Sequence, residues 1–328
     1  MEARGPASRR ADHDQIRQHR LRVMRIRALD SPSMSVASRV LAKLGKRAPR
    51  VEEAAVRANW RRHNRSRSFD AAKLTDHVQR ALVNELVQDG FAKGRFEELI
   101  GESALFDDAA AQAHRLYERR DQTRFEGGGG KATYLAKLAT KRFDASDPFV
   151  RIALHPAVLA VANGYLGLRS TLRALELWHT WPTSGKAIQT QLWHRDADDV
   201  MNVKLFCYFT DVTVAAGPLT YAPGTHPLGD RRTRPEHDEH MRSTDDQMAQ
   251  IVPQQEWVIL EGKPGTLVFA DTCGYHKQLK PQSDERLKLV AQYVSGSPYV
   301  GRELELENLD ASALTEDQHY AAFDRPRP

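Results

Sequence analysis

Hydrophobic residues recur at helical spacing in the first half of the chain and at strand spacing in the second half. The first pattern predicts amphipathic helices over 68–90, ending at Gly90, over 103–120, and over 155–167, where Pro156 lies in the first turn. Helices followed by strands favour a helical layer packed on a β-sandwich over alternating βαβ units. Apolar runs rich in β-branched and aromatic residues predict the strands, over 172–181, 186–194, 202–212, 256–262, 265–271 and 287–294.

Two long loops interrupt this pattern. Residues 126–133, EGGGGKAT, are a poor match to a phosphate-binding loop, because Lys131 is not followed by the Ser or Thr that the motif needs. We expect a loop that enters a helix and could bring this lysine to an anionic substrate. Residues 226–255 show no strand pattern, and loops of this length are often lids over a site. His237 and His240 in this loop are predicted to be exposed, because no third ligand type is placed to complete a metal site.

Positive charge is concentrated near the N-terminus. Residues 1–68 contain 18 Lys and Arg against 6 Asp and Glu, while the whole chain contains 48 against 43, so the remainder is net negative. We interpret 1–68 as a basic, helical arm that packs on the main domain or on a subunit. An anionic lipid surface or another polyanion is a second candidate partner, and a mitochondrial transit peptide is a third, disfavoured by the acidic residues of the arm. The negative charge of the rest argues against nucleic-acid binding by the main domain.

The composition is typical of a globular protein in a reducing compartment. A hydrophobic share of 41% is enough for a core, and no stretch approaches the roughly 18 consecutive apolar residues of a membrane span. The N-terminus lacks the apolar segment of a secretory signal. Cys207 and Cys273 both lie in apolar runs, so we expect two buried thiols rather than a disulfide, and a cytoplasmic location.

One set of residues carries recognisable metal chemistry. His194 and Asp196 are two residues apart at the end of a predicted strand, so their side chains point to the same side. His276 follows the predicted strand over 265–271, and Arg286 begins the next one. Two histidines and one carboxylate on one face are typical ligands of non-haem Fe(II), which keeps its other positions open for substrate and O₂. The sequence therefore predicts an iron site with an arginine nearby as an anion anchor.

The segments around these residues resemble the phytanoyl-CoA dioxygenase family of Fe(II)- and 2-oxoglutarate-dependent oxygenases. The resemblance is carried by QLWHRDADDVMNVKLFCYFTDVTVAAGPLTYAPGTH and DTCGYHKQLKPQSDERLKLVAQYVSG, and it spans about 172–297. It implies a mainly β fold, a double-stranded β-helix (jelly roll, cupin-like) packed by helices. It also implies His194, Asp196 and His276 as iron ligands. Arg286 is the implied partner of the distal carboxylate of 2-oxoglutarate, which a planar guanidinium can bind through two hydrogen bonds.

Further contacts to the cosubstrate follow less directly from the resemblance. Gln191 could donate to the C1 carboxylate of 2-oxoglutarate, or it could be an ordinary strand glutamine. Lys204 lies in a very apolar strand, where it could line the pocket, extend its ammonium group to water or form a structural ion pair. Trp178 and Trp193 could form pocket walls, although aromatic residues in such strands are more often part of the core.

The resemblance implies an enzyme that couples the oxidative decarboxylation of 2-oxoglutarate, to succinate and CO₂, with oxidation of a C–H bond by O₂. Asp196 favours hydroxylation, because related halogenases lack this carboxylate and bind chloride in its place. No second arginine follows Arg286 in the manner of the nucleic-acid-repair relatives, so we expect a small-molecule substrate such as a secondary metabolite, an amino acid or an acyl derivative. The alternative is a metal-binding jelly roll without turnover.

The predicted organisation of the chain has two parts. Residues 1–68 form the arm and residues 69–328 the dioxygenase domain, whose barrel core spans about 172–297 with the loop over 226–255 as its lid. The substrate, the oxidised position and the oligomeric state stay open at this point. A role of the arm in docking the oxygenase on an anionic membrane or a polyanion also stays open.

Overall fold

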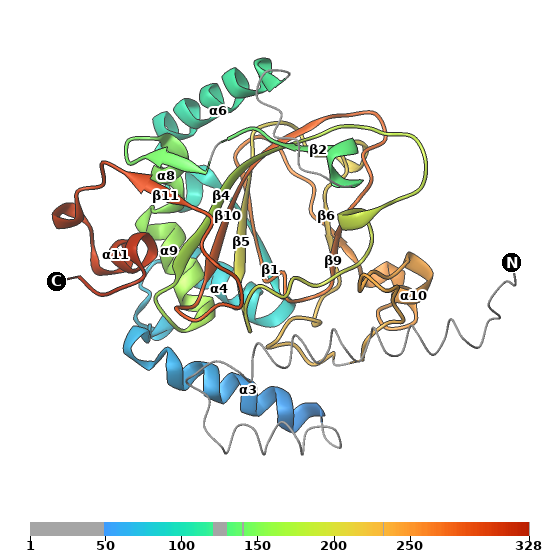
Figure 1. Cartoon of the computed structure of the whole chain (residues 1–328), viewed down its shortest axis with the longest axis horizontal. Coiled ribbons are helices and arrows are strands. Elements are labelled where there is room, and N and C mark those ends of the chain that lie inside the picture. The colour runs from blue at the N-terminus through green and yellow to red at the C-terminus, as the bar shows by residue number, and fades with distance from the viewer. Residues whose placement is uncertain (1–48, 121–129, 140, 232, 328) are drawn as a thin grey trace, which may run out of the picture.

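Two antiparallel sheets face each other at the centre of the molecule, and helices cover the outer face of the larger one (Figure 1). The computed structural model describes residues 49–120, 130–139, 141–231 and 233–327. This mixed architecture agrees with the predicted helical layer on antiparallel strands.

The larger sheet has the strand order β1-β8-β5-β10-β4-β2, and every neighbouring pair in it runs antiparallel. Its central strands are nearly continuous apolar runs because both faces are covered, one by helices and the other by the smaller sheet. Its strands are β1 Phe91–Arg95, β2 Leu135–Lys137, β4 Thr171–Thr180, β5 Val203–Tyr208, β8 Thr266–Ala270 and β10 Arg286–Val294.

The smaller sheet has the order β7-β6-β9, with β6 Leu219–Tyr221, β7 Val258–Ile259 and β9 His276–Gln278. A separate parallel pair joins β3 Arg142–Asp144 to β11 Glu305–Glu307. Burying each large apolar side chain between the two facing sheets contributes roughly 1.5–3 kcal/mol to stability. The buried cluster between them comprises Phe206, Tyr208, Val212, Leu219, Tyr221, Leu260, Val268, Ala270 and Val290.

Alternation along β10 places charged side chains between the sheets. Leu287 and Leu289 belong to the apolar cluster beneath the helices, whereas Val290 belongs to the cluster between the sheets. Because side chains alternate along a strand, Arg286 and Lys288 share the face of Val290. Both are buried, so this strand carries two cations into the protein interior.

The helix boundaries follow from their capping residues. Helix α4 (His77–Asp89) begins after Asp76, whose carboxylate accepts a backbone hydrogen bond, and it ends at Gly90, whose φ of 87° favours glycine. The predicted helix over 68–90 is therefore a 3-10 turn, Ala71–Lys73, followed by α4. Helices α6 (Ser103–Glu118) and α9 (Pro156–Leu166) match the two other predicted helices. The remaining described α-helices are α3 Pro49–His63, α5 Phe96–Leu99, α8 Pro148–Ala153, α10 Asp245–Ala249 and α11 Glu316–Phe323.

The strand predicted over 186–194 is wrong. This segment contains a 3-10 turn, Gln189–Gln191, and Gln189 has a φ of 54°, in the left-handed region that interrupts a strand. At its end His194 does pair, in an isolated antiparallel bridge with His276. An alternating pattern alone does not distinguish a strand from an extended segment that finds a backbone partner at only one end.

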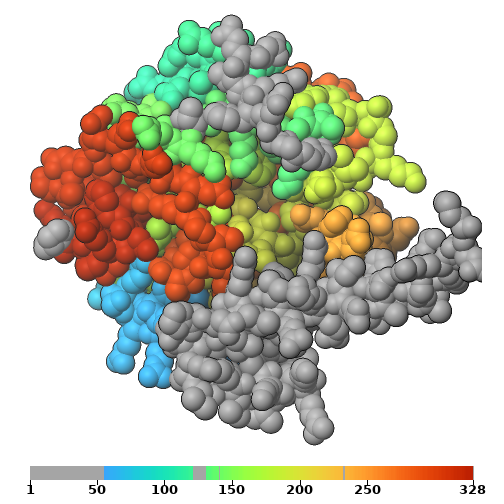
Figure 2. Space-filling model, in the orientation of Figure 1, coloured from blue at the N-terminus to red at the C-terminus, as the bar shows by residue number. Residues whose placement is uncertain are grey.

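Helix α3 packs against the segment that follows the predicted metal ligands. The buried Trp60 donates from Nε1 to Asp199 Oδ1 at 3.0 Å, and Asn64 accepts a hydrogen bond from Gly296 N at 3.0 Å. Figure 2 shows the end of this helix in blue, directly below the red C-terminal segment. Residues 1–48, with the helices and partners predicted for them, lie outside the described residues.

Both cysteines are buried and free, which confirms the prediction of two buried thiols. Burial raises the pKa of Cys207 to about 12, so this thiol is unreactive as a nucleophile near neutral pH. In the described part of the chain, no helix has both the length and the apolar character that a membrane crossing needs.

Replacing Trp60 with alanine should lower the free energy of unfolding by about 3–5 kcal/mol, because a buried indole is lost and Asp199 keeps one donor fewer. Trp60→Phe retains an aromatic ring and should cost only about 1 kcal/mol. Val56→Ala, at an exposed position of the same helix, is the matched control and should change stability by less than about 0.5 kcal/mol. Urea unfolding measures all three variants. Equal stability of Trp60→Ala and the wild type would contradict the packing of α3 on the body.

Candidate functional site

His194, Asp196 and His276 meet in space beside the smaller sheet. The backbone N–H groups of His194 and His276 donate to each other's carbonyl oxygens, both at 3.0 Å. Side chains of such a pair lie on the same side, and the two rings are 4.2 Å apart. Asp196 returns to that side two residues later, and its N–H donates to Thr272 O at 2.7 Å. Ligand atoms from the three residues all lie within 4.8 Å of one another.

Backbone carbonyls fix the proton of each histidine on Nδ1. His194 Nδ1 donates to Leu192 O at 2.9 Å, and His276 Nδ1 donates to Gly274 O at 3.1 Å. The Nε2 atom of each ring therefore keeps a lone pair for a metal ion. Burial lowers the pKa of both rings, and that of His194 lies well below its usual value, so both are neutral near pH 7. Two neutral imidazoles and a carboxylate on one side suit a divalent ion such as Fe(II).

Lys204 holds the Asp196 carboxylate. Its Nζ lies 2.6 Å from Asp196 Oδ2, while Oδ1 lies 3.9 Å from His194 Nε2. Burial alone would raise the pKa of Asp196, but the charge of Lys204 beside it holds that pKa well below its usual range. Burial would lower the pKa of Lys204, and Asp196 and Asp198 raise it. Both partners are therefore charged. Of the three roles considered for Lys204, the structure shows the ion pair, and its partner is Asp196.

Arg286 and Lys288 are buried side by side, and neither forms an ion pair within the described residues. Arg286 Nη2 and Lys288 Nζ both donate to Gln278 Oε1, at 2.6 and 3.0 Å, and Arg286 Nη1 donates to Gly217 O. Arg286 Nε has no hydrogen-bond partner. Burial lowers the pKa of Arg286 to about 10 and that of Lys288 well below its usual value. Lys288 was missed as a site residue, although a lysine inside a buried apolar strand is itself a signal.

The other residues considered from the sequence have different environments. Gln191 Oε1 accepts a hydrogen bond from Ile188 N at 3.1 Å, while its Nε2 is buried without a partner. Trp178 lies across from Lys288 on β4, with the ammonium group 5.1 Å from the centre of a ring, so it lines the interior between the sheets. Trp193 is instead fully buried in a separate small apolar cluster, which agrees with the core interpretation.

The loop over 226–255 is folded around helix α10. Thr244 begins this helix with a capping box, a pair of reciprocal hydrogen bonds with the third helical residue, and a backbone bridge joins the loop to Trp193. His237 is half-buried and His240 is exposed, and neither belongs to a metal-binding group within the described residues. The capping box is the sequence signal that indicates an ordered element inside this loop.

A buried acid supports the turn that leads to β9. Asp271 accepts hydrogen bonds from the Tyr165 hydroxyl at 2.6 Å and from Cys273 N at 2.8 Å. The side chain is fully buried, and burial raises the pKa of Asp271 to about 6. Because Tyr165 belongs to α9, this contact joins the helical layer to the turn that positions His276.

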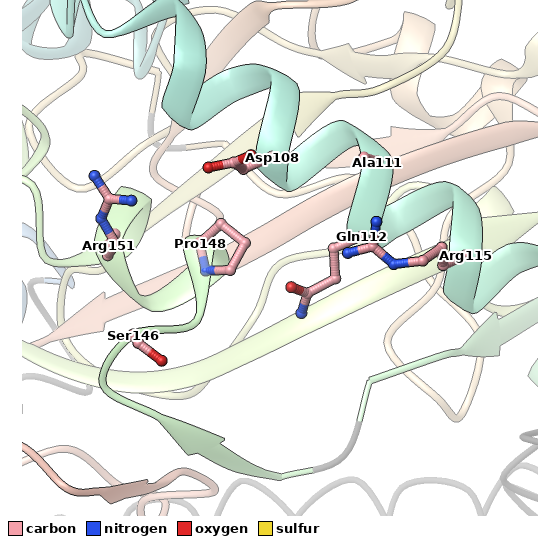
Figure 3. A pocket seen from close by; sticks show the side chains of 7 residues that line it. All are labelled: Asp108, Ala111, Gln112, Arg115, Ser146, Pro148 and Arg151. Atoms are coloured by element: carbon pink, nitrogen blue, oxygen red, sulfur yellow. The ribbon is translucent and has the colours of Figure 1, made fainter.

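A separate pocket of about 200 Å³ lies between α6 and the beginning of α8 (Figure 3). Two polar groups at this pocket already have protein partners, since Gln112 Nε2 donates to Asp147 at 2.8 Å and Arg151 lies 3.5 Å from Glu102. The lining residues belong to neither sheet and include none of the predicted ligands. They are Asp108, Ala111, Gln112, Arg115, Ser146, Pro148 and Arg151.

The class of protein follows from the comparison with protein families. The model of the family described as phytanoyl-CoA dioxygenase (PhyH) matches residues 86–285, more than half of the chain. The chain therefore belongs to the phytanoyl-CoA dioxygenase family, and so to the enzymes that depend on Fe(II), 2-oxoglutarate and O₂. No curated protein sequence matches the chain significantly.

The solved structures that match the chain do so at low sequence identity. The epimerase SnoN, in complex with Fe³⁺, alpha-ketoglutarate and nogalamycin RO, shares 20% identity over 69% of this chain and 86% of its own, with a TM-score of 0.49. AviO1 from Streptomyces viridochromogenes Tue57 shares 18% identity over 70% and 99%, with a TM-score of 0.47. EctD from S. alaskensis shares 17% over 68% and 86%, also with a TM-score of 0.47.

The stability that protonated Asp271 contributes should be lost as the pH rises. Its carboxyl keeps the proton up to a pKa of about 6 in the folded protein and up to about 4 when unfolded, so the folded state binds more protons in that window. By linkage, the free energy of unfolding of the wild type, relative to Asp271→Asn, should fall between about pH 4 and 6, on the order of 2–3 kcal/mol. Urea unfolding across this range measures it. A difference between the two proteins that stays constant with pH would contradict the raised pKa.

Proposed function

We propose that this chain is a 2-oxoglutarate-dependent hydroxylase acting on a small molecule, with His194, Asp196 and His276 as the ligands of its iron. Membership of the family carries the general chemistry. The observation that best supports the more specific proposal is the buried Arg286, which has no ion pair in the described chain and is bonded to the strand that begins with His276. A buried cation bonded only to neutral acceptors favours an anionic ligand.

The unpaired donors of the interior fit a dicarboxylate. We assign the distal carboxylate of 2-oxoglutarate to Arg286, with Lys288 beside it and Thr180 across from it on β4, whose buried hydroxyl has no partner. We assign the C1 carboxylate to Gln191, whose buried Nε2 also has none. A buried donor without a hydrogen-bond partner lowers stability by roughly 1–3 kcal/mol, and a bound carboxylate would accept the missing hydrogen bond.

The chemistry proposed for the site is hydroxylation. When bound, iron and 2-oxoglutarate supply the oxidant for a C–H bond of the substrate. His194, Asp196 and His276 would hold the metal ion through ligand atoms that lie within 4.8 Å of one another, and a site with three protein ligands would keep further positions for cosubstrate and O₂. Asp196 would take the ligand position that a halide would need, so its carboxylate favours hydroxylation over halogenation in this proposal.

We also infer that the two facing sheets are the halves of a double-stranded β-helix with the metal at its mouth. Support comes from the apolar cluster between the sheets and from the ligands at the end of the smaller one. In this proposal residues 69–328 form the oxygenase domain, α3 docks on it through Trp60, and the loop over 226–255 covers the site.

A metal-binding module without turnover is the alternative function. It would use the same three ligands but would have no need of Arg286, Lys288 and Gln191 beside them, so the enzyme is the better account. A docking role of the basic N-terminal residues on an anionic membrane or a polyanion stays a prediction from charge, since residues 1–48 lie outside the described structure.

His276→Ala should weaken binding of a divalent metal by at least about 100-fold, because one of three ligands is removed. Titration of the metal-free protein with Co(II), followed by visible absorption, measures the affinity without turnover. His240→Ala, at an exposed histidine of the loop, is the matched control and should bind Co(II) like the wild type. Equal affinity of His276→Ala and the wild type would place the metal elsewhere.

Arg286→Gln should weaken 2-oxoglutarate binding by on the order of 2–5 kcal/mol, because a buried charged pair is lost. Anaerobic titration of the Fe(II)-loaded protein with 2-oxoglutarate measures this change. Co(II) affinity should be unchanged, since Arg286 does not touch the predicted ligands. Lys263→Gln, at an exposed lysine that pairs with Asp211, is the control. Unaltered 2-oxoglutarate affinity of Arg286→Gln would show that the distal carboxylate binds elsewhere.

A further inference from the structure

Arg242 lies across from the predicted metal ligand His194. Trp193 and Ser243 form an antiparallel backbone pair, with N–H to oxygen distances of 3.0 and 2.9 Å. Because the two segments run antiparallel, the residue after Trp193, His194, lies opposite the residue before Ser243, Arg242. The side chains of two residues opposite each other point to the same side. On its other edge, the segment that contains Trp193 and His194 pairs with His276, through the backbone bridge between His194 and His276. His194 therefore has a histidine on one flank and an arginine on the other.

Within the described residues, the guanidinium group of Arg242 forms no hydrogen bond or ion pair, although Asp196 and Asp238 act on it electrostatically. Its Nε atom is buried without a hydrogen bond, and its side chain forms no ion pair in the described residues. The backbone of Arg242 is well fixed, because its N–H donates to Asp238 Oδ1 at 2.8 Å and its carbonyl accepts from Asp238 N at 2.8 Å. A residue with an ordered backbone and an unsatisfied charged head is suited to bind an anion.

The charge of Arg242 acts on the candidate metal site. The Trp193–Ser243 pair sets Arg242 beside His194, so the guanidinium charge lies on the side of the predicted ligands. Burial raises the pKa of Tyr134, whose hydroxyl lies 2.7 Å from Thr190 Oγ1, and Arg242 partly offsets that rise. The guanidinium group is therefore near the space bounded by the two histidines and this tyrosine.

A second cation lies near the same space. Lys131 is exposed to solvent and forms no ion pair among the described residues. Partial removal from water and the charges of Arg242 and Lys204 lower its pKa, while Asp196 raises it. The 3-10 turn that carries Lys131, Gly130–Thr133, contacts the turn Gln189–Gln191 that precedes His194, so this lysine lies on the side of the candidate site.

Iron and cosubstrate would not neutralise these two charges. Fe(II) and the 2-oxoglutarate dianion carry equal and opposite charge, so together they add none to the site. Lys204 is already paired with Asp196 at 2.6 Å. Arg242 and Lys131 would stay positive beside a fully loaded metal centre.

We propose that the substrate carries a carboxylate, sulfate or phosphate group near the C–H bond that is oxidised, and that Arg242, assisted by Lys131, binds this group. The inference rests on the proposed function of the site. Because Arg242 flanks His194, an anion held there brings the adjoining carbon atoms next to the metal. A guanidinium group binds a carboxylate through two parallel hydrogen bonds, so it fixes orientation as well as affinity. Arg242 is thus a specificity residue that favours an acid over its amide or ester.

One other carboxylate has the same chemistry. The C1 carboxylate of 2-oxoglutarate, assigned above to Gln191, would also lie on the metal side of the site, whereas the distal carboxylate is assigned to Arg286. A contact of Arg242 with the C1 carboxylate would weaken cosubstrate binding when the arginine is replaced, and a contact with the substrate would not.

The test is anion binding to the full-length protein loaded anaerobically with Fe(II) and saturating 2-oxoglutarate. Acetate, sulfate and inorganic phosphate are the probes, and the visible absorption of the Fe(II)–cosubstrate complex is the readout. Arg242→Gln should weaken binding of the best probe by about 10- to 100-fold, as expected for loss of a charged hydrogen-bonded contact. Arg242→Lys and Lys131→Met should give intermediate losses. Arg231→Gln, which removes a loop arginine paired with Glu256, is the control and should have no effect.

A second arm uses turnover. Pools of small carboxylic acids and their methyl esters are compared for substrate-stimulated succinate release, and the wild type should respond to acids while Arg242→Gln loses that preference. The proposal is overturned if no probe binds the wild type, if the probes bind the wild type and Arg242→Gln equally, or if Arg242→Gln weakens 2-oxoglutarate rather than the probes. Failure of the wild type to bind 2-oxoglutarate at all would instead refute the proposed function. Anion binding to the Co(II) protein without cosubstrate would then still test Arg242.

Discussion

The antiparallel backbone pair between His194 and His276 is the constraint on which the rest of the site depends. It joins a segment with no regular strand to the first residue of β9 through two hydrogen bonds of 3.0 Å. Residues 82 positions apart thereby present their rings to the same side, and Asp196 follows from the alternation of an extended chain. Because each Nδ1 is committed to a carbonyl two residues earlier, the pairing also decides which ring nitrogen faces a metal. Position and protonation of the ligands thus come from the backbone.

Buried positive charge is the second constraint, and it conflicts with stability. Arg286 and Lys288 lie inside the protein on neutral acceptors, and burial depresses the pKa of both. Packing between the sheets by residues such as Phe206 and Val290 offsets this cost, because these side chains are fully or almost fully withdrawn from water. Arg286 and Lys288 lower the stability of the fold, so we explain their presence by an anionic ligand that binds them. Here the family chemistry supplies a dianion of suitable charge.

Features set by local chemistry could be predicted from the sequence. Helix α4 ends at Gly90 as expected, and apolar runs gave the central strands of the larger sheet. The spacing of His194 and Asp196 put both side chains on one side, as predicted. Features set by distant contacts could not be predicted in this way. The left-handed turn at Gln189 depends on where the chain must go next, and an alternating pattern does not record it.

Arg242 shows most clearly where sequence reasoning stops. In the printed sequence it lies in a long polar loop, and nothing nearby suggests a metal site. Its place beside His194 comes from one backbone bridge between Trp193 and Ser243, two residues with no pairing signal of their own. The same short segment thus pairs with His276 on one edge and with the segment that contains Arg242 on the other, so the proposed metal ligands and the neighbouring cation share one piece of backbone. A change in the loop over 226–255 is therefore expected to alter the surroundings of Arg242 while the three proposed ligands stay in place, as is typical of binding residues that loops carry on a fixed scaffold.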